Sequence, residues 1–267
     1  MAELPLIIEA GELARHLPAP ALLLVDLNAP EHYRQGHIPG AVQLDYSALV
    51  AARPPVMGLL PDAAQLSQVF SALGLTPDTH VVAYDAEGGG KAGRLIYTLH
   101  AIGHEKCSWL NGGWLAWQAA GLPVETGANT PQPSSYRATL RAANAVDKSF
   151  IQAKLGSLKL IDTRTPGEFS GVDVRAARGG HIPGARNLDW TLAMDRARDY
   201  RLKPENELRA LLAERGVDPG DEVVVYCQTH HRSAHTYTWL KALGYRVKGY
   251  PGAWSDWGND PGTPVEK

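Results

Sequence analysis

Short apolar runs recur along the chain, and longer stretches with helical spacing lie between them. The apolar runs are rich in Val, Leu and Ile, are bounded by turn residues, and cover 22–26, 81–84, 158–162 and 223–226. The helical stretches are Asp62–Leu73, Arg94–Ile102, Glu205–Glu214 and Ala234–Leu243. Apolar runs without strict alternation, separated by helices, are typical of parallel strands that are buried on both faces. The pattern therefore predicts an α/β fold with small, mostly parallel sheets flanked by helices.

The pattern occurs twice. The string Gly-His-Ile-Pro-Gly-Ala stands at 36–41 and recurs unchanged at 180–185. Two further pairs of segments follow in the same order, VVAYD at 81–85 with VVVYC at 223–227 and NGGWLAW at 111–117 with PGAWSDW at 251–257. Motifs that repeat in one order indicate a duplicated structural unit. We therefore expect two homologous domains of similar size.

A stretch of different composition separates the two halves. Thr126 to Ala145 is rich in Thr, Pro, Ser, Asn and Ala and lacks sustained apolar periodicity, as is typical of a surface connection. We therefore expect a first domain at 1–125, a linker at 126–145 with the boundary near residue 135, and a second domain at 146–267.

Composition and charge agree with this organisation and exclude several classes of protein. The chain has 267 residues, of which 44% are hydrophobic and 20% charged, as is ordinary for two globular domains. Its 26 basic and 28 acidic side chains leave a formal net charge of -2, so no overall field attracts nucleic acid or an anionic membrane. No apolar stretch approaches the roughly 18–20 residues of a membrane span. Since the start also lacks a basic region ahead of an apolar run, we expect a soluble, cytoplasmic protein.

The two halves differ at the end of one strand, and this difference gives the first candidate for chemistry. Cys227 follows the run VVVY in the second half, whereas Asp85 stands at the matching position in the first. In α/β sheets ligands bind at the carboxyl ends of strands, where the N–H groups of a tight loop and a helix N-terminus favour anions. Such surroundings lower the pKa of a thiol and make the thiolate nucleophilic. We predict that Cys227 is catalytic and that the first domain is inactive.

Other motif residues are predicted to be structural. Cys107 corresponds to a presumed strand position of the second half, and two cysteines suggest no disulfide framework. His37 and His181 occur in both halves and are assigned to the architecture of a turn. Asp162 and Arg164 are expected to form a structural pair at a strand end. The tryptophans of the two Trp-containing motifs are expected to pack in the cores.

A second difference between the halves brings in arginines. The strand-end aspartate precedes the histidine of Gly-His-Ile-Pro-Gly-Ala by 11 positions in the first half and by 19 in the second, so the second half carries an insertion. Arginine suits planar anions because it donates two parallel hydrogen bonds. We predict that Arg178, in the insertion, and Arg186, shortly after it, bind substrate. For Arg175, a substrate role and a solvated surface position remain equally open.

Together these motifs resemble two-domain rhodaneses. The resemblance rests on the duplicated Gly-His-Ile-Pro-Gly-Ala string, the paired tryptophan motifs, the segment AGLPVE that ends the first half, and the lone cysteine after the second VVVY run. It covers nearly the whole chain. The loop Cys-Gln-Thr-His-His-Arg at 227–232 is similar to that of bacterial thiosulfate:cyanide sulfurtransferases, and it departs from the loops of more familiar thiosulfate and mercaptopyruvate enzymes. The resemblance implies tandem rhodanese-like domains, of which the second is catalytic.

The resemblance also implies a double-displacement reaction. The Cys227 thiolate attacks the outer sulfur of thiosulfate, sulfite leaves, and the cysteine persulfide passes its sulfur to cyanide, a thiol, a dithiol or an acceptor protein. The residues expected to bind substrate lie in the same loop: Gln228, Thr229, His230, His231 and Arg232. They would stabilise the sulfonate and the persulfide through N–H groups and positive charge. The reaction implies no cofactor beyond the covalent persulfide, and a monomer is the default.

Other functions remain open. The donor could be 3-mercaptopyruvate, or Cys227 could act chiefly as a persulfide carrier to partner proteins. A cysteine phosphatase or arsenate reductase also places a thiolate in an anion-binding loop, but the loop of those enzymes is Cys-x5-Arg. Arg232 makes it Cys-x4-Arg here, one residue too short to enclose phosphate in the same way. His231 and His235 have the helical spacing of a metal pair, but no third ligand is suggested and no metal site is predicted.

Overall fold

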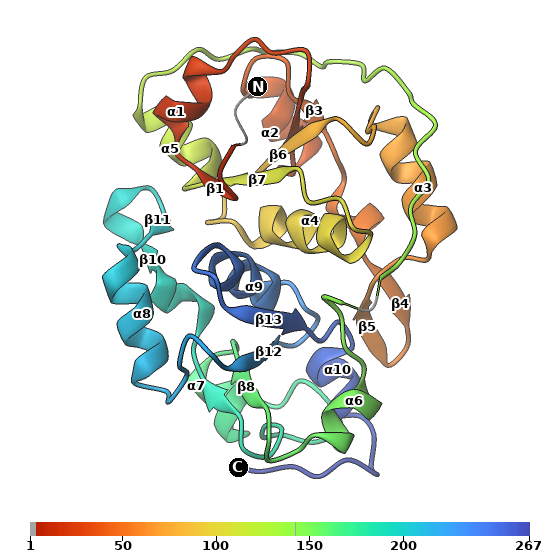
Figure 1. Ribbon diagram of the computed structural model, residues 1–267, viewed down its shortest axis with the longest axis vertical. Helices are drawn as coiled ribbons and strands as arrows, with labels where there is room; N and C mark the ends of the chain where they lie inside the picture. Colours follow the sequence, from red (N-terminus) through yellow and green to blue (C-terminus); the bar gives the residue numbers. More distant parts are fainter. Residues whose placement is uncertain (1–3, 142) are drawn as a thin grey trace. The chain divides into compact units, whose positions relative to one another are not determined.

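A computed structural model describes residues 4–141 and 143–267, so residues 1–3 of the expected first domain and residue 142 of the expected linker lie outside it. The chain forms two compact units, each drawn as a sheet with helices in Figure 1. Unit 1 comprises Met1–Leu49, Pro61–Arg141 and Asp195–Leu202, and unit 2 comprises Val50–Leu60, Ala142–Met194 and Lys203–Lys267. Two short segments, 50–60 and 195–202, therefore belong to the unit formed mainly by the other half of the sequence. Most of the expected linker, 126–141, belongs to unit 1.

Unit 1 is built on a five-stranded sheet in the order β1-β7-β6-β2-β3, in which every neighbouring pair is parallel. Its strands are β1 (Ile7–Ile8), β2 (Leu22–Asp26), β3 (Val42–Gln43), β6 (His80–Tyr84) and β7 (Cys107–Leu110). Its helices are α1 (Ala10–Arg15), α2 (Pro30–Gln35), α3 (Ala63–Ala72), α4 (Gly90–Ala101) and α5 (Gly113–Ala119), with short turns η1 (Tyr46–Leu49) and η3 (Arg196–Arg198). Helix α4 packs against β6 and β7.

Unit 2 repeats this plan with a four-stranded parallel sheet in the order β13-β12-β8-β9. Its strands are β8 (Lys159–Asp162), β9 (Arg186–Asn187), β12 (Glu222–Tyr226) and β13 (Arg246–Gly249). Its helices are α6 (Lys148–Ala153), α7 (Pro166–Ser170), α8 (Glu205–Ala213), α9 (Arg232–Ala242) and α10 (Ala253–Trp257), with the turn η2 (Trp190–Ala193). Two small sheets complete the chain, β4 (Ala51–Arg53) with β5 (Val56–Leu59), and β10 (Met194–Asp195) with β11 (Arg201–Leu202).

The predicted elements are confirmed, and their ends show where sequence patterns are weak. Strand β2 covers the predicted 22–26, and β6, β8 and β12 begin within one residue of prediction. Helix α3 begins after Asp62, whose side chain accepts the N–H of Gln65 and caps the helix. Helix α4 begins at Gly90, four residues earlier than predicted, because glycines are poor helix formers and hide the start of the pattern. The hairpin β4–β5, which packs against α10 in unit 2, was not predicted.

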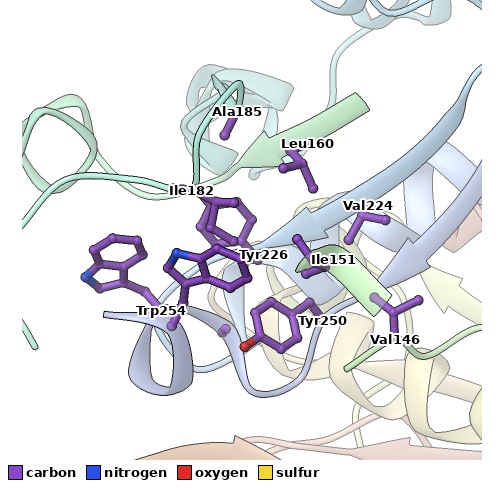
Figure 2. Close-up of a cluster of buried hydrophobic side chains, with 11 residues drawn as sticks. Val146, Ile151, Leu160, Ile182, Ala185, Val224, Tyr226, Tyr250 and Trp254 are labelled. Carbon is purple, nitrogen blue, oxygen red and sulfur yellow. The ribbon is translucent and has the colours of Figure 1, made fainter. Parts of the chain in front are cut away.

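The core of unit 2 carries the strand end at which the second-half cysteine stands. Figure 2 shows Tyr226, Trp254 and Ile182 gathered in one cluster of buried side chains. The Tyr226 hydroxyl accepts a hydrogen bond from the Ile182 N–H (3.1 Å), so the last residue of β12 is tied to the second Gly-His-Ile-Pro-Gly-Ala turn. The predicted core position of Trp117, Trp254 and Trp257 is confirmed, since each is at most 1% exposed, whereas Trp114 is only half-buried and packs against the core of unit 1. Among the described residues, no helix is both long and apolar enough to span a bilayer.

Candidate active site

Cys227 lies directly after β12, where the core ends and a polar loop begins. The Cys227 carbonyl accepts a hydrogen bond from the Trp254 N–H (2.9 Å), and the Gln228 carbonyl accepts one from the Ser255 N–H (3.0 Å). Both donors lie on α10, which is anchored in the core. The first two residues of the loop are therefore held from a second element as well as from the strand.

The loop reverses direction so that several groups converge on the cysteine sulfur. The N–H group of Thr229, and the N–H group and hydroxyl of Ser233, act as hydrogen-bonding groups on Cys227 and lower its pKa. Ser233 lies in the first turn of α9 and is fully buried. We call these three groups, the two N–H groups and the Ser233 hydroxyl, the sulfur cradle. A negatively charged sulfur is the species that such a set of donors favours.

The surroundings of Cys227 favour the thiolate. Burial of the side chain, which is 1% exposed, raises the pKa of Cys227. The charge of Arg232 and the donors of the sulfur cradle act in the opposite direction and outweigh burial, so the pKa lies below that of an ordinary thiol. The site thus has a thiol that is shielded from solvent and ionises readily.

Arg232 is held beside Cys227 by a buried carboxylate that the sequence analysis missed. The Arg232 Nη1 donates to Glu168 Oε2 (2.6 Å) and Nη2 donates to Oε1 (2.9 Å), a forked pair of hydrogen bonds. The Glu168 side chain is 0% exposed. Burial raises the pKa of Glu168, but the hydrogen bonds and charge of Arg232 dominate and lower it to about 2. Arg175, whose Nε lies 3.5 Å from Glu168 Oε1, is largely exposed on the outer side of the pair.

The sequence does contain a signal for Glu168. Each half has an aromatic ring stacked on the histidine of Gly-His-Ile-Pro-Gly-Ala, Tyr33 in unit 1 and Phe169 in unit 2. When the halves are aligned on these rings, His32 stands where the second half has Glu168. Glu168 is therefore specific to the second half, as Cys227 is. It also completes a Thr-x-x-Glu capping box at 165–168, which places it on the first turn of α7.

Gln228 and Thr229 contribute to the loop in different ways. The Gln228 Nε2 donates to the Arg175 carbonyl (2.9 Å), while its Oε1 is buried and has no hydrogen-bond partner among the described residues. The Thr229 backbone lies against Gly58 of β5, where an added Cβ would be 2.3 Å from the Thr229 carbonyl oxygen. The hairpin from the first half of the sequence thus supports the cysteine loop of unit 2.

The three histidines of this region have separate environments. His230 is 0% exposed, and its Nδ1 lies 2.8 Å from Ser233 Oγ, so the ring contacts one of the three groups of the sulfur cradle. His231 and His235 both meet the ring of Trp190 edge-on, with centroid distances of 5.9 and 5.3 Å. Burial, followed by the charge of His231, lowers the pKa of His235 to about 3. Within residues 4–141 and 143–267, no three His, Cys, Asp or Glu side chains are grouped to hold a metal ion.

The two arginines predicted to bind substrate, Arg178 in the insertion and Arg186 after it, have contacts outside the cysteine loop. The guanidinium of Arg178 donates to the carbonyls of Trp257 (3.0 Å) and Thr263 (2.7 Å) and to the Thr263 hydroxyl (2.6 Å). Arg178 therefore holds the C-terminal segment, and the prediction that it binds substrate is corrected. Arg186 is exposed on β9. It lines a surface hollow together with Asn187 and residues 214–216, and none of these residues belongs to the cysteine loop. The sequence around an arginine does not indicate which backbone carbonyls its guanidinium will contact.

Unit 1 has the same loop plan around a carboxylate. Asp85 Oδ1 accepts the N–H of Glu87 (3.0 Å) and of Gly89 (2.8 Å), and Oδ2 accepts the N–H of Ala92 (2.9 Å). The buried carboxyl group of Asp85 occupies the place that the cysteine sulfur has in unit 2. Burial and the charge of Glu87 raise its pKa, against the effect of the three N–H groups. The other thiol, Cys107, is buried in β7, and burial raises its pKa far above the ordinary range. Its sulfur lies 3.3 Å from the Nε2 of the buried His100.

The residues assigned to architecture are confirmed in that role. The Nδ1 of His37 lies 2.7 Å from the Tyr33 carbonyl of α2, and the Nδ1 of His181 lies 2.9 Å from the Phe169 carbonyl of α7. The Nε2 atoms lie 3.5 Å and 3.6 Å from the carboxylates of Glu125 and Glu266. Arg164 donates twice to Asp162 (Nε to Oδ1, 3.0 Å; Nη2 to Oδ2, 2.6 Å) and lies over the Trp254 ring. This buried pair closes the strand end beside β12.

Comparison with known proteins adds a family and an activity. The family model described as "Rhodanese-like domain" matches residues 9–120 and 147–260. A thiosulfate sulfurtransferase of Pseudomonas aeruginosa is 45% identical over 268 residues, which cover 99% of this chain and 98% of that protein. One from Azotobacter vinelandii is 44% identical with the same coverage.

More distant relatives carry other names. The sulfur carrier protein TtuD of Thermus thermophilus is 33% identical over 88% of this chain and 87% of its own length. Among solved structures, SseA of Escherichia coli, described as a 3-mercaptopyruvate sulfurtransferase of "Rhodanese" fold, has a TM-score of 0.81 and 29% identity over 94% of this chain and 99% of that one.

Proposed function

The chain belongs to the rhodanese family as a member with two tandem domains, and from this premise we propose that Cys227 carries sulfane sulfur as a persulfide between a donor and an acceptor. The protein is an enzyme of the thiosulfate sulfurtransferase class, like its relatives over the full chain. The observation that carries the proposal is the position of Cys227, whose buried sulfur lies in the sulfur cradle next to Arg232, with a lowered pKa.

In the first half-reaction the Cys227 thiolate attacks the outer sulfur of thiosulfate. A bond forms between the two sulfurs, the bond to the sulfonate sulfur breaks, and its electron pair leaves with sulfite. In the second, a nucleophile attacks the outer sulfur of the persulfide, and the electron pair of that S–S bond returns to Cys227 as the thiolate. Cyanide as the nucleophile gives thiocyanate; a thiol or dithiol gives its own persulfide. Two half-reactions through one covalent intermediate predict ping-pong kinetics.

The residues of the loop support both half-reactions electrostatically. The sulfur cradle stabilises negative charge on Cys227 before attack and on the persulfide after it, because its N–H groups are fixed by the backbone. Arg232 adds a permanent positive charge, and its forked bonds to Glu168 keep it from moving away. We propose that this charge also attracts the anionic donor. Because sulfur is carried by Cys227 itself, we propose that no resident cofactor takes part.

A mass measurement tests the proposal. After incubation with thiosulfate and removal of excess reagent, the intact protein should gain about 32 Da, the mass of one sulfur, and peptide mapping should place it on Cys227. Cys227→Ala should neither gain this mass nor form thiocyanate, whereas Cys107→Ala should do both. A gain of mass that stays in Cys227→Ala would disprove the assignment.

A second candidate is supported by the carrier relative. We propose as the alternative that Cys227 hands its sulfur chiefly to partner proteins, because a relative that covers most of this chain is named a sulfur carrier protein. Such a role uses the same persulfide, but turnover with small acceptors would be slow while transfer to a protein thiol is fast. Single-turnover transfer from the loaded enzyme to cyanide and to the thiol of a carrier protein separates the two.

The donor and the site of action also belong to this proposal. We propose thiosulfate rather than 3-mercaptopyruvate as the preferred donor, since the relatives matched over the full chain are named for it. A thiolate nucleophile has to stay reduced, and both cysteines are free thiols. We therefore propose that the enzyme works in the cytoplasm, where thiols persist. We also propose that it works as a monomer.

A further inference from the structure

The hydroxyl of Ser233 has two neighbours and only one proton to donate. The Oγ lies 2.8 Å from the Nδ1 of His230. The hydroxyl also acts on Cys227, whose pKa it lowers as a hydrogen-bonding group. A thiolate accepts hydrogen bonds and donates none, so toward a charged sulfur the hydroxyl has to be the donor. The proton between Ser233 and His230 must then come from the imidazole. The ionised state of Cys227 therefore requires the tautomer of His230 that carries hydrogen on Nδ1.

The neutral thiol permits the reverse arrangement. When Cys227 holds its own proton, the Ser233 hydroxyl is free to donate to Nδ1, and His230 adopts the other tautomer. The three side chains therefore form one chain of hydrogen bonds whose direction follows the state of the sulfur. A donor that is oriented in advance stabilises the anion more than one that must turn round first.

The backbone gives an independent reason to assign a role to the His230 side chain. His230 has a φ of 57°, in the left-handed region, and is fully buried. The residue at the matching place in the loop of unit 1 is Gly89, with a φ of 95°. Glycine adopts this conformation without strain. The partner residue differs in the same way: Ser233 corresponds to Ala92, whose N–H binds Asp85 but which has no hydroxyl. Imidazole and hydroxyl are therefore both present in the loop that surrounds a sulfur and both absent from the loop that surrounds a carboxyl group.

We propose that His230 and Ser233 are positioning residues for the sulfurtransferase reaction, in which His230 orients the Ser233 hydroxyl toward the sulfur of Cys227 in both the thiolate and the persulfide. This inference rests on the proposed function of Cys227. It replaces the expectation that His230 binds the substrate directly. The bonds described place the ring on Ser233, one side chain removed from the reacting sulfur.

The other charged groups near Cys227 are accounted for. Arg232 of α9 faces the sulfur and is paired with Glu168 of α7, which also lies near Arg175. His231 and His235 pack on Trp190. None of these contacts involves Ser233 or His230, so we expect a shift in the ionisation of the thiol in a Ser233 or His230 variant to report on the hydrogen-bond chain.

The test is the rate at which iodoacetamide alkylates Cys227 as a function of pH, followed by mass spectrometry. A hydrogen bond to a charged group predicts that Ser233→Ala slows alkylation at neutral pH by about tenfold, through a higher pKa of the thiol. His230→Gly, which installs the residue of unit 1 and relieves the left-handed strain, should slow it almost as much. The double variant should be no slower than Ser233→Ala, because both changes remove the same bond.

Rescue and control variants separate orientation from mere support of the fold. His230→Asn keeps an N–H donor and tolerates a positive φ, so it should retain most of the wild-type rate. If His230→Gly leaves the pH profile unchanged, or if the two single effects multiply in the double variant, the inference is wrong. The proposed function is judged separately, by whether thiosulfate adds a sulfur to Cys227 in the wild type, and alkylation needs no such transfer.

Discussion

The buried pair of Glu168 and Arg232 allows a prediction in which the stability of the fold falls while the reactivity of the Cys227 thiol does not. Replacing Glu168 by Gln keeps the size of the side chain and one acceptor oxygen but removes the charge. The side chain is 0% exposed, and that of Arg232 is 16% exposed, so the remaining arginine would be left largely buried with only the Cys227 thiolate as a counter-charge. Breaking such a pair from one side is far more costly than breaking a surface pair.

The magnitude follows from the pKa of Glu168. The pKa is lowered from 4.5 to about 2, and at about 1.4 kcal/mol per unit this corresponds to roughly 3 kcal/mol of stability at pH 7. Because the folded state lowers the pKa, this stability is present above pH 4.5 and is lost as the pH falls toward 2. Glu168→Gln should therefore be about 3 kcal/mol less stable at pH 7 and should lack this part of the acid dependence.

The reactivity of the Cys227 thiol should not fall with the stability of the fold. Glu168 partly neutralises the charge that Arg232 presents to Cys227. Because the amide oxygen of Gln still accepts a hydrogen bond that keeps Arg232 beside the sulfur, the substitution should leave the pKa of Cys227 as low as before or lower. Alkylation of Cys227 at neutral pH should therefore be at least as fast as in the wild type. The variant would be less stable than the wild type, but its Cys227 would ionise at least as readily.

Urea unfolding at pH 7, 5 and 3, with hydrogen exchange to assign the transition to unit 2, measures the first effect, and alkylation measures the second. The control is Glu205→Gln, which breaks the surface pair of Glu205 with Arg209 on α8 and should cost about 0.5 kcal/mol or less. A loss below about 1 kcal/mol for Glu168→Gln, or an acid dependence identical to that of the wild type, would refute the reasoning.

Three further predictions use other contacts. Gly58→Ala should lower kcat and cost about 1–3 kcal/mol, because its Cβ would collide with the Thr229 carbonyl, whereas Gly220→Ala, with no atom within 4 Å, should be silent; equal activities of the two would contradict this. Arg232→Ala should raise the KM for dianionic thiosulfate more than that for 3-mercaptopyruvate, by about tenfold in the ratio, and equal changes would argue against a donor-binding charge. Arg178→Met should lower the thermal midpoint through its lost bonds to the C-terminal segment while the KM for thiosulfate stays unchanged; a raised KM would restore its substrate role.

The parts of the fold that could be predicted from the sequence are those with local signals. The continuous apolar runs gave the inner strands because such strands are buried on both faces, and Asp62 marked the start of α3 because its side chain caps the helix. The repeated Gly-His-Ile-Pro-Gly-Ala string located both turns. The strand-end comparison singled out Cys227 in the same way, since its loop and helix follow directly in the chain.

The parts that could not be predicted depend on partners distant in sequence. Glu168 and Arg232 are separated by 64 positions, and neither the burial of the carboxylate nor its forked geometry has a local pattern. Arg178 meets carbonyls near the C-terminus, about which its own neighbours carry no information. The hairpin β4–β5 was missed because its strands are short, and its Met57 N–H bonds the Ser255 hydroxyl, 198 positions away.

The exchanged segments have a consequence for how the protein is made. The hairpin Val50–Leu60 leaves the ribosome early, yet its partners on α10 are among the last residues synthesised. Unit 1 in turn lacks its final segment until Leu202 has been added, after half of unit 2 already exists. Domains usually fold one after another during synthesis, in chain order. In this protein the two units must reach completion together, and a gene cut at the linker would give two fragments that each lack a piece of their own structure.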